Sequence, residues 1–232
     1  MEDLSRAFSL AARLIVNGDA ELIGIVGLSL RVSGAATLIA FALGAPLGAA
    51  LAVWRFPGRH AVVVAVHALL GLPPVVVGLL LYVALSRSGP LGAMGLLFTP
   101  AAMTTAQAVL ALPIVVALTH RTVEGYWRDY GAALLVDGAS LARACLELLS
   151  MARGALVTVL LAAFGRCVAE VGAILVVGGN IRGFTRTMTT AIALETSKGD
   201  LALALALGLT LITISAAVSA AAFGLQRAAE GR

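Results

Sequence analysis

The chain has 232 residues, of which 60% are hydrophobic and only 12% are charged, and its mean hydropathy is +1.02. Soluble domains average about 45–50% apolar and about 25% charged residues, so this composition indicates a protein that lies in a bilayer. The net charge of +4 is spread along the chain without a basic block, which argues against nucleic-acid binding. The two cysteines form neither a disulfide framework nor a CxxC site, and we interpret both as packing residues.

The first segment predicts a short interfacial helix over residues 3–16, because its apolar residues recur on one helical face. It is too short to span a membrane, since a span needs about 20 residues, and its acidic start is unlike that of a signal peptide. An Asn-Gly-Asp break ends it, so residues 1–19 are expected to form an interfacial N-terminal segment.

Five apolar runs follow, each long enough to cross a hydrocarbon core of about 30 Å as a helix. They predict a transmembrane domain over residues 20–226 and a C-terminal tail at 227–232. Arg31 lies within the first run, so the span itself is expected nearer 32–53, with Arg31 close to an interface. The runs lie at about 22–53, 61–85, 100–119, 154–177 and 201–224.

Two of these runs carry a further signal. The second contains Pro73-Pro74, which predicts a kink because a proline removes a helix hydrogen bond. Such a break is tolerated where it is buried in protein or lines a cavity. The last run begins LALALALGL (201–209), which we interpret as a lipid-facing helix.

The longest polar connection, residues 120–153, predicts two short helices joined near Asp137-Gly138. Gly138 can supply a left-handed residue at a helix end, and Ala139-Ser140 would open the next helix. A connector needs only a few residues, so this length favours a docking elbow over an ordinary linker.

The sequence lacks the motifs of the common catalytic sites. Its only lysine, Lys198, is not part of a phosphate-binding Gly-Lys-Ser/Thr loop, so ATP hydrolysis by this chain is not expected. The three histidines are scattered, without a His/Cys cluster, and no GxSxG elbow is present. We therefore expect a non-enzymatic chain with no catalytic residue, bound metal or cofactor.

Two charges remain in the fourth run, Arg166 and Glu170. Because they are four residues apart, they would lie on one helical face and partly neutralise each other. Ionisable groups in membrane helices usually face a bundle interior or a water-filled path. Two interpretations stay open: a gate or subunit contact on the translocation path, and a structural pair that fixes the rotation of the helix.

Three stretches resemble the membrane subunit of type I ABC importers, in the tungstate and molybdate permease family and closest to its tungstate branch. TLIAFALGAPLGAALAVWRFPG (37–58) resembles the first core span and inner loop of molybdate-type permeases, and the 120–153 elbow stands where the ATPase subunit docks. FGRCVAEVGAILVVGGNIRGFTRTMTTAIALETSKGD (164–200) resembles the tungstate permeases and is the most specific of the three. Together the resemblance covers most of residues 22–225.

The docking pattern of that family is Glu-Ala-Ala, three residues, Gly, and then Leu-Pro twelve and thirteen residues on. In this sequence Ala133 and Gly138 match, whereas the Leu-Pro positions read Ser150-Met151. The resemblance implies ATPase coupling by the elbow residues Ala133, Asp137, Gly138, Ala139 and Ser140.

The resemblance implies an all-α polytopic permease fold that works as a homodimer. Its partners would be membrane lipid, two ATP-binding cassette subunits on the cytoplasmic face and an extracytoplasmic solute-binding protein, with ATP and Mg bound by the ATPase subunits. The N-terminus would lie outside and the C-terminus in the cytoplasm, because the elbow must face the cytoplasm; the distribution of arginines among the loops favours the same orientation. ATP-driven closure would push on the elbow and rock the spans between outward- and inward-open states.

With this topology the polar strip 178–200 lies outside, where we interpret it as an outer mouth that touches the binding protein. A tetrahedral dianion such as tungstate accepts hydrogen bonds without donating any, so a donor-rich mouth suits it. The alternative is a solvated loop whose threonines cap the next helix. The candidate donors are Asn180, Arg182, Thr185, Arg186, Thr187, Thr189 and Thr190.

The expected function is therefore ATP-driven import of an oxyanion, with tungstate first. Molybdate and sulfate are alternatives, because they are tetrahedral dianions of similar hydrogen-bonding demand. Two other classes stay open: a secondary transporter, which would work alone and often shows repeated halves, and a membrane scaffold, which needs no donor-rich mouth. Copurification with an ATPase would discriminate against both.

Overall fold

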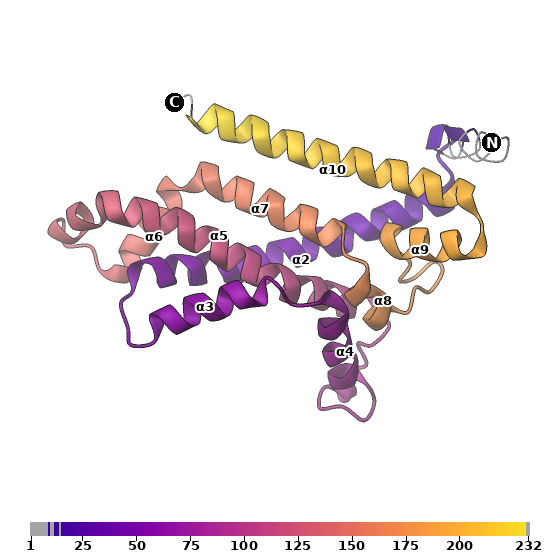
Figure 1. Ribbon diagram of the computed structural model, residues 1–232, viewed down its shortest axis with the longest axis horizontal. Coiled ribbons are helices and arrows are strands. Elements are labelled where there is room, and N and C mark those ends of the chain that lie inside the picture. The colour runs from indigo at the N-terminus through magenta and orange to yellow at the C-terminus, as the bar shows by residue number, and fades with distance from the viewer. Residues whose placement is uncertain (1–8, 10–11, 14, 231–232) are drawn as a thin grey trace. The chain divides into compact units, whose positions relative to one another are not determined.

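The computed structural model describes residues 9, 12–13 and 15–230, with side chains described through residue 224. All regular elements in this part of the chain are helices (Figure 1), which confirms the predicted all-α fold. In chain order they are α2 (Ala20–Val53), α3 (Arg59–Leu69), α4 (Pro74–Leu85), the 3₁₀ turn η1 (Gly92–Met94), α5 (Pro100–Val136), α6 (Leu141–Met151), α7 (Arg153–Val168), α8 (Gly172–Gly178), α9 (Met188–Lys198) and α10 (Leu201–Glu230).

The interfacial helix predicted over residues 3–16 falls mostly outside the described residues. After it, Gly18 adopts a φ of 61°, and the Oδ1 atom of Asp19 accepts a hydrogen bond from the N–H of Leu22 at 3.0 Å. An aspartate at this position satisfies one of the unpaired N–H groups in the first turn of a helix. The helical residues described in this segment are Ser9, Ala12, Arg13, Ile15 and Val16.

Three described helices are each long and apolar enough to cross a membrane, namely Ala20–Val53, Pro100–Val136 and Leu201–Gly224. Two bent pairs, α3 with α4 and α6 with α7, meet the same criterion only when each pair is taken together. The chain therefore has between three and five candidate spans. The upper number agrees with the prediction of about five.

The proline pair divides the second predicted run into two helices. Pro73 precedes α4 with an extended backbone (ψ 122°), and Pro74 is the first residue of that helix. Proline suits the first helical position because its missing N–H would have no partner there, and the residue before a proline avoids helical angles. The expected kink is therefore a complete break.

The described chain divides into two compact units. Unit 1 comprises residues 1–35, 73–107 and 167–217, and unit 2 comprises residues 36–72, 108–166 and 218–232. The long helices α2, α5 and α10 each contribute residues to both units.

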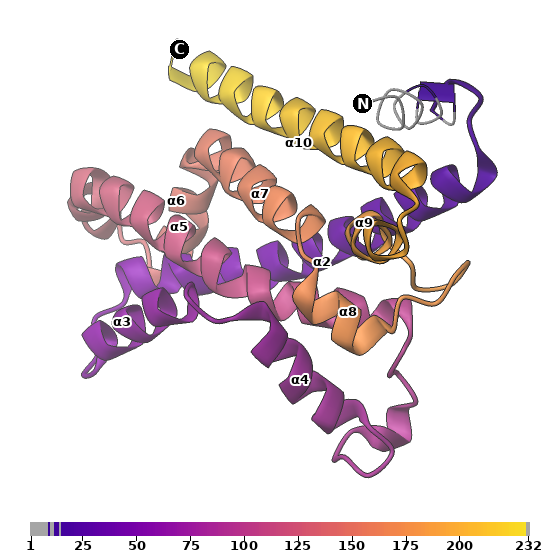
Figure 2. The ribbon, with the colours of Figure 1, turned by 45° about the vertical axis from the view of Figure 1, so that its right-hand side comes forward.

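In unit 1, glycines let α4 and α8 lie against each other (Figure 2). A Cβ atom at Gly78 would lie 2.8 Å from the Cα of Ala173, and one at Gly172 would lie 2.7 Å from a methyl group of Val75. Small residues are the usual means by which membrane helices approach closely.

The buried side chain of Gln107 donates to the carbonyl of Cys167 at 2.9 Å, which satisfies a carbonyl in the last turn of α7.

In unit 2, the Gly44-x-x-x-Gly48 sequence of α2 packs against α5. A Cβ atom at Gly44 would lie 2.9 Å from the Cβ of Val115, and one at Gly48 would lie 2.7 Å from the carbonyl oxygen of Val116. Two glycines four residues apart on one helix permit this backbone approach. Positions 44 and 48 therefore both require glycine, because a Cβ atom at either would collide with α5.

The fourth predicted span was wrong as a single helix over 154–177. α7 ends at Val168 and α8 begins at Gly172, with a non-helical segment between them. The side chain of Glu170 explains the interruption, because its Oε1 atom accepts a hydrogen bond from the N–H of Ala173 at 3.1 Å. This bond satisfies an N–H in the first turn of α8, which would otherwise have no partner.

The connection 120–153 also differs from the prediction of two short helices. Its first part is not a separate helix, because α5 continues without a break to Val136 over 37 residues. Gly125 and Gly131 are the only strong helix-weakening residues in this part, and isolated glycines lower helix stability without ending a helix. The elbow therefore stands at the end of a long, continuous helix.

The segment 201–209, which was interpreted as a lipid-facing helix, has both exposed and buried positions. Ala204, Ala206 and Leu207 are buried, whereas Leu201 and Leu209 are exposed. The alternating Leu-Ala run places small residues on the packed face of α10, and this pattern does not distinguish a packed face from a lipid-facing one.

Candidate functional site

The elbow at residues 137–140 has the turn geometry that the sequence predicted. Gly138 has a φ of 77°, the left-handed region that glycine adopts without steric cost. The N–H of Asp137 donates to the carbonyl of Ala133 at 2.9 Å, and the N–H of Ala139 donates to that of Leu134 at 3.0 Å. These bonds satisfy carbonyls in the last turn of α5, so α5 ends in a closed, hydrogen-bonded turn.

The next helix begins directly after this turn. Ser140 is the N-cap of α6, and its Oγ atom accepts a hydrogen bond from the N–H of Arg143 at 3.3 Å. At its other end α6 meets α7 at an angle of 78° around Ala152. α6 is therefore a short helix set across the direction of α7, in a position fixed by a cap and two sharp breaks.

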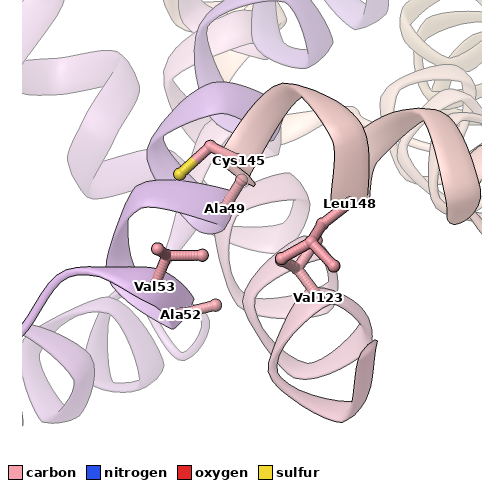
Figure 3. Packing of buried hydrophobic residues seen from close by; sticks show 6 residues of the cluster. All are labelled: Ala49, Ala52, Val53, Val123, Cys145 and Leu148. Carbon is pink, nitrogen blue, oxygen red and sulfur yellow. The ribbon is translucent and has the colours of Figure 1, made fainter. Parts of the chain in front are cut away.

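One face of α6 is anchored in the core of unit 2 (Figure 3). Leu148 is fully buried, and Cys145 lies in the same cluster, with an exposed fraction of 9%. Burying such side chains stabilises a helix by roughly 1.5–3 kcal/mol each. The other members of the cluster come from α2 and α5 and are Ala49, Ala52, Val53 and Val123.

The residues around the elbow expose large apolar side chains. Val136 is 87% exposed and Leu146 is 69% exposed, and Leu135 and Leu141 are also exposed. Apolar side chains gathered beside a polar turn are typical of a protein contact surface. We call residues 135–141 together with Leu146 the elbow surface.

A polar network that sequence reasoning missed lies at the start of α3. The Nε of Arg59 donates to the carbonyl of Leu51 at 2.6 Å, and one of its terminal nitrogens donates to Glu124 Oε1 at 3.2 Å. The same nitrogen lies 3.1 Å from Nε2 of His120. The carbonyl of Leu51 belongs to the last turn of α2, where it has no partner within the helix and where a positive charge is favourable. An arginine shortly after a long apolar run was the available signal.

The polar strip 178–200 begins with two residues in the left-handed region, Gly179 (φ 69°) and Asn180 (φ 51°). A Cβ atom at Gly179 would lie 2.9 Å from the ring of Phe98, so this close approach also requires glycine. The side-chain amide of Asn180 donates to the carbonyl of Thr190 at 3.2 Å. The strip is therefore folded back on itself and is held by its own side chains.

Four threonines of the strip use their hydroxyl groups inside unit 1. The hydroxyl of Thr185 donates to a carbonyl of α8 at 2.6 Å, and that of Thr189 donates to the carbonyl of Glu170 at 2.7 Å. Thr187 and Thr190 form a capping box at the start of α9. The expectation that these hydroxyls are offered to a solute was wrong, because the backbone already takes them; the helix-capping alternative holds for Thr187 and Thr190.

The arginines of the strip are held in a charged cluster. Arg182 forms a two-point ion pair with Glu21, in which its Nε lies 2.9 Å from Oε1, and this hydrogen bond raises the pKa of Arg182. Arg186 lies 3.5 Å from Glu21 and 3.4 Å from Glu195, and Lys198 lies 3.1 Å from Glu195. The side chain of Arg182 is 73% exposed, whereas that of Arg186 is only 10% exposed. Arg182 is thus the more accessible of the two.

Arg166 and Glu170 do not share a helical face as expected. Arg166 lies in the last turn of α7, and Glu170 lies beyond the end of that helix, with an exposed fraction of 3%. The four-residue spacing has its usual meaning only within one continuous helix. Glu170 instead caps α8, in the hydrogen bond to Ala173 described above.

Within the residues that the structure describes, no group of three or more histidine, cysteine, aspartate and glutamate side chains could hold a metal ion. Both cysteines are buried, Cys145 on the inner face of α6 and Cys167 near the end of α7. Their burial agrees with the packing role that the sequence predicted.

Comparison with known proteins gives one family and several relatives. The family of binding-protein-dependent transport system inner membrane components matches residues 44–231. A probable anion ABC transporter permease protein of Haloferax volcanii is 43% identical over 78% of this chain and 80% of its own length. A tungstate uptake system permease protein of Peptoclostridium acidaminophilum is 37% identical over 97% of this chain and 99% of its own length, and a molybdenum transport system permease protein of Escherichia coli K12 is 31% identical over 71% and 76%.

Proposed function

The chain belongs to the family of binding-protein-dependent transport system inner membrane components, and from this membership we propose that it is the permease subunit of an ATP-driven importer of tungstate. The observation that carries the substrate is the match to the tungstate uptake permease, which extends over 97% of this chain. The molybdenum permease covers less of the chain at lower identity, so molybdate is the second substrate.

The chain is a multi-pass inner membrane protein and a transport component. We place its N-terminus outside and its C-terminus in the cytoplasm. In this orientation the elbow between α5 and α6 lies inside and the outer mouth lies outside. More of the arginines outside the spans fall on the side of the elbow than on the side of the strip 178–200, which supports the assignment, since basic residues are concentrated on the cytoplasmic side of membrane proteins.

The elbow surface is the docking site for a separate ATP-binding cassette subunit, which binds ATP and Mg and carries out hydrolysis. Two copies of the permease, two ATPase subunits and an extracytoplasmic binding protein make up the importer. The exposed apolar residues beside the elbow support the docking role, and the buried face of α6 supports transmission, because a push on α6 reaches α2 and α5 through Leu148. The coupling residues are Ala133, Asp137, Gly138, Ala139 and Ser140.

At the outer mouth, Arg182 and Arg186 are the residues that meet the binding protein or its anion. Asn180, Thr185, Thr189 and Thr190 contribute by holding the strip in shape, since their side chains form hydrogen bonds to backbone groups within unit 1. Arg166 and Glu170 belong to the translocation path, and the break in the helix beside Glu170 supports a place where the path can change.

The test is uptake into membrane vesicles that hold this chain, its ATPase and its binding protein, with tungstate, molybdate and sulfate in competition. We expect ATP-dependent uptake in which tungstate outcompetes the others. Preference for another oxyanion would support an ATP-driven importer but contradict tungstate as its substrate. Uptake without ATP would indicate a secondary transporter, and it would overturn the proposal.

The outer mouth has its own variants. Arg182→Ala with Arg186→Ala should reduce uptake while the complex still assembles. The matched control is Arg87→Ala, which removes an exposed arginine of unit 1 outside the strip. Uptake that is equal in both would remove the mouth from the mechanism.

A further inference from the structure

Three arginines of unit 1 line one cavity. The cavity has a volume of about 620 Å³, and its walls come from the first turns of α2 and from the loop before α9. Arg31 comes from α2, and Arg182 and Arg186 come from the loop, while Glu21 supplies a carboxylate to the same cavity. The remaining wall is largely small or apolar, with Gly24, Gly27, Leu28, Gly183 and Phe184 among its residues.

Arg31 is the residue that the functions described so far do not explain. It is charged, it lies inside the apolar helix α2, and it makes no hydrogen bond or ion pair within the described residues. A charged side chain in a membrane helix is costly, and it usually faces a cavity or a path where it has a function. In this chain it faces a cavity that two other guanidinium groups already line.

Arg186 has an unsatisfied hydrogen-bond donor beside the same cavity. Its side chain is 10% exposed, and its Nε–H has no hydrogen-bond partner among the described residues. A buried donor of a charged group is normally satisfied. A guanidinium group in this state can accept one further anionic partner after a small rotation.

The charges around the cavity do not balance. Three arginines face the single carboxylate of Glu21, and Glu21 is already shared between Arg182 and Arg186. Beside the cavity, Glu195 is shared between Arg186, at 3.4 Å, and Lys198, at 3.1 Å, so the basic groups still outnumber the two carboxylates. The cavity therefore has a net positive charge that suits a doubly charged anion, and guanidinium groups bind such oxygen atoms through paired N–H donors.

We propose that this cavity is a transit site for a tetrahedral oxyanion within the permease, with Arg31, Arg182 and Arg186 as its ligands. Glu21 is the internal counter-ion, which holds two of the arginines in the empty site and is displaced when the dianion binds. The glycines of the wall let an anion approach the helix closely. The identity of the anion as tungstate rests on the proposed function, whereas the site requires only a tetrahedral dianion.

The test measures binding in the absence of transport. The full-length permease is placed in lipid nanodiscs without ATPase, nucleotide or binding protein, and sodium tungstate is titrated by equilibrium dialysis with tungsten quantification. We expect saturable binding that sulfate competes for and chloride does not. Arg31→Ala should weaken binding about tenfold, as expected for one lost charge-assisted hydrogen bond, and Arg31→Lys should recover part of it.

Two variants separate a binding role from a structural one. Glu21→Gln should tighten tungstate binding several-fold, because the competing carboxylate charge is removed. Arg87→Ala is the control, and it should leave binding unchanged. Weaker binding in Glu21→Gln would mean that the cluster only holds the fold together and would overturn the proposal.

The remaining outcomes also decide the matter. The proposal fails if the unmodified chain shows no saturable tungstate binding at millimolar concentrations, or if Arg31→Ala behaves like Arg87→Ala. ATP-dependent uptake without tungstate binding in nanodiscs would support the proposed importer and contradict the proposed anion site. Tungstate binding without ATP-dependent uptake would support the anion site and contradict the importer.

Discussion

Gly48 offers the sharpest test of the packing in unit 2. A Cβ atom at this position would lie 2.7 Å from the carbonyl oxygen of Val116, 2.8 Å from the Cβ of Thr119 and 2.9 Å from the N–H nitrogen of His120. Two of these three atoms belong to the backbone of α5 and cannot rotate away. Gly48→Ala should therefore force α2 and α5 apart.

The size of the effect follows from two opposing terms. Replacing a helical glycine by alanine gains about 1 kcal/mol from helix propensity, and inserting a methyl group into a packed interface costs about 1–3 kcal/mol. Gly34→Ala in the same helix gains only the first term, because no atom lies within 4 Å of a Cβ there. The free energy of unfolding of Gly48→Ala should thus fall below that of Gly34→Ala by about 1–3 kcal/mol.

The assay is unfolding of the detergent-purified chain by sodium dodecyl sulfate, followed by tryptophan fluorescence, with Gly125→Ala in α5 as a second open-space control. The two controls should match or exceed the unmodified chain in stability. Equal stability of Gly48→Ala and Gly34→Ala would refute the close contact between α2 and α5.

Three further predictions concern α3, α6 and the elbow, all in unit 2. Leu148→Ala should lower the free energy of unfolding by about 2–5 kcal/mol, because Leu148 is fully buried on the inner face of α6. Leu146→Ala, at an exposed position of the same helix, should change it little, and the same unfolding assay measures both. Arg59→Ala should lower the free energy of unfolding by about 1.5–3 kcal/mol, because it leaves the carbonyl of Leu51 and the carboxylate of Glu124 without this partner. Arg59→Lys should restore only part of the loss in the thermal midpoint, because lysine lacks the forked donors of a guanidinium group. Full restoration by lysine would show that the forked geometry is not needed. Gly138→Val should reduce copurification of the ATPase with little effect on membrane insertion, because the left-handed backbone conformation costs valine about 1–2 kcal/mol. Gly138→Asn is the control and should behave nearly as the unmodified chain, because asparagine tolerates this backbone conformation. Normal assembly and transport in Gly138→Val would contradict the coupling role.

Local features of the chain predicted the elements that depend on neighbouring residues. The proline pair at 73–74 divides the second run, and Gly138 closes the end of α5 in the left-handed region, both for reasons present within a few residues. The apolar composition predicted the membrane class and the all-helical fold in the same way. The break between α7 and α8 was not predicted, because apolar periodicity does not reveal that the side chain of Glu170 accepts a hydrogen bond in the first turn of α8.

In the strip 178–200, the chemistry of the side chains could not be predicted from the sequence. Four of its threonines were expected to be available donors, namely Thr185, Thr187, Thr189 and Thr190. Thr185 and Thr189 donate to carbonyls that lie seven and nineteen residues away along the chain, so their availability was decided by the packing. Arg59 was missed for the same reason, because its partner Glu124 is 65 residues away.

Composition, apolar period and turn residues were sufficient to predict a helical membrane protein with an elbow at 137–140 and a polar strip at 178–200, because these properties arise from short segments of chain. Whether a donor is free, whether a charge has a partner, and which arginines face one cavity depend on segments distant in sequence. Arg31 illustrates this difference: the sequence placed it at an interface, and the folded chain sets it beside Arg182 and Arg186 in one cavity. A side chain acquires its chemistry from the groups that surround it, and in this protein the decisive groups are brought together by the packing of α2 against the loop before α9.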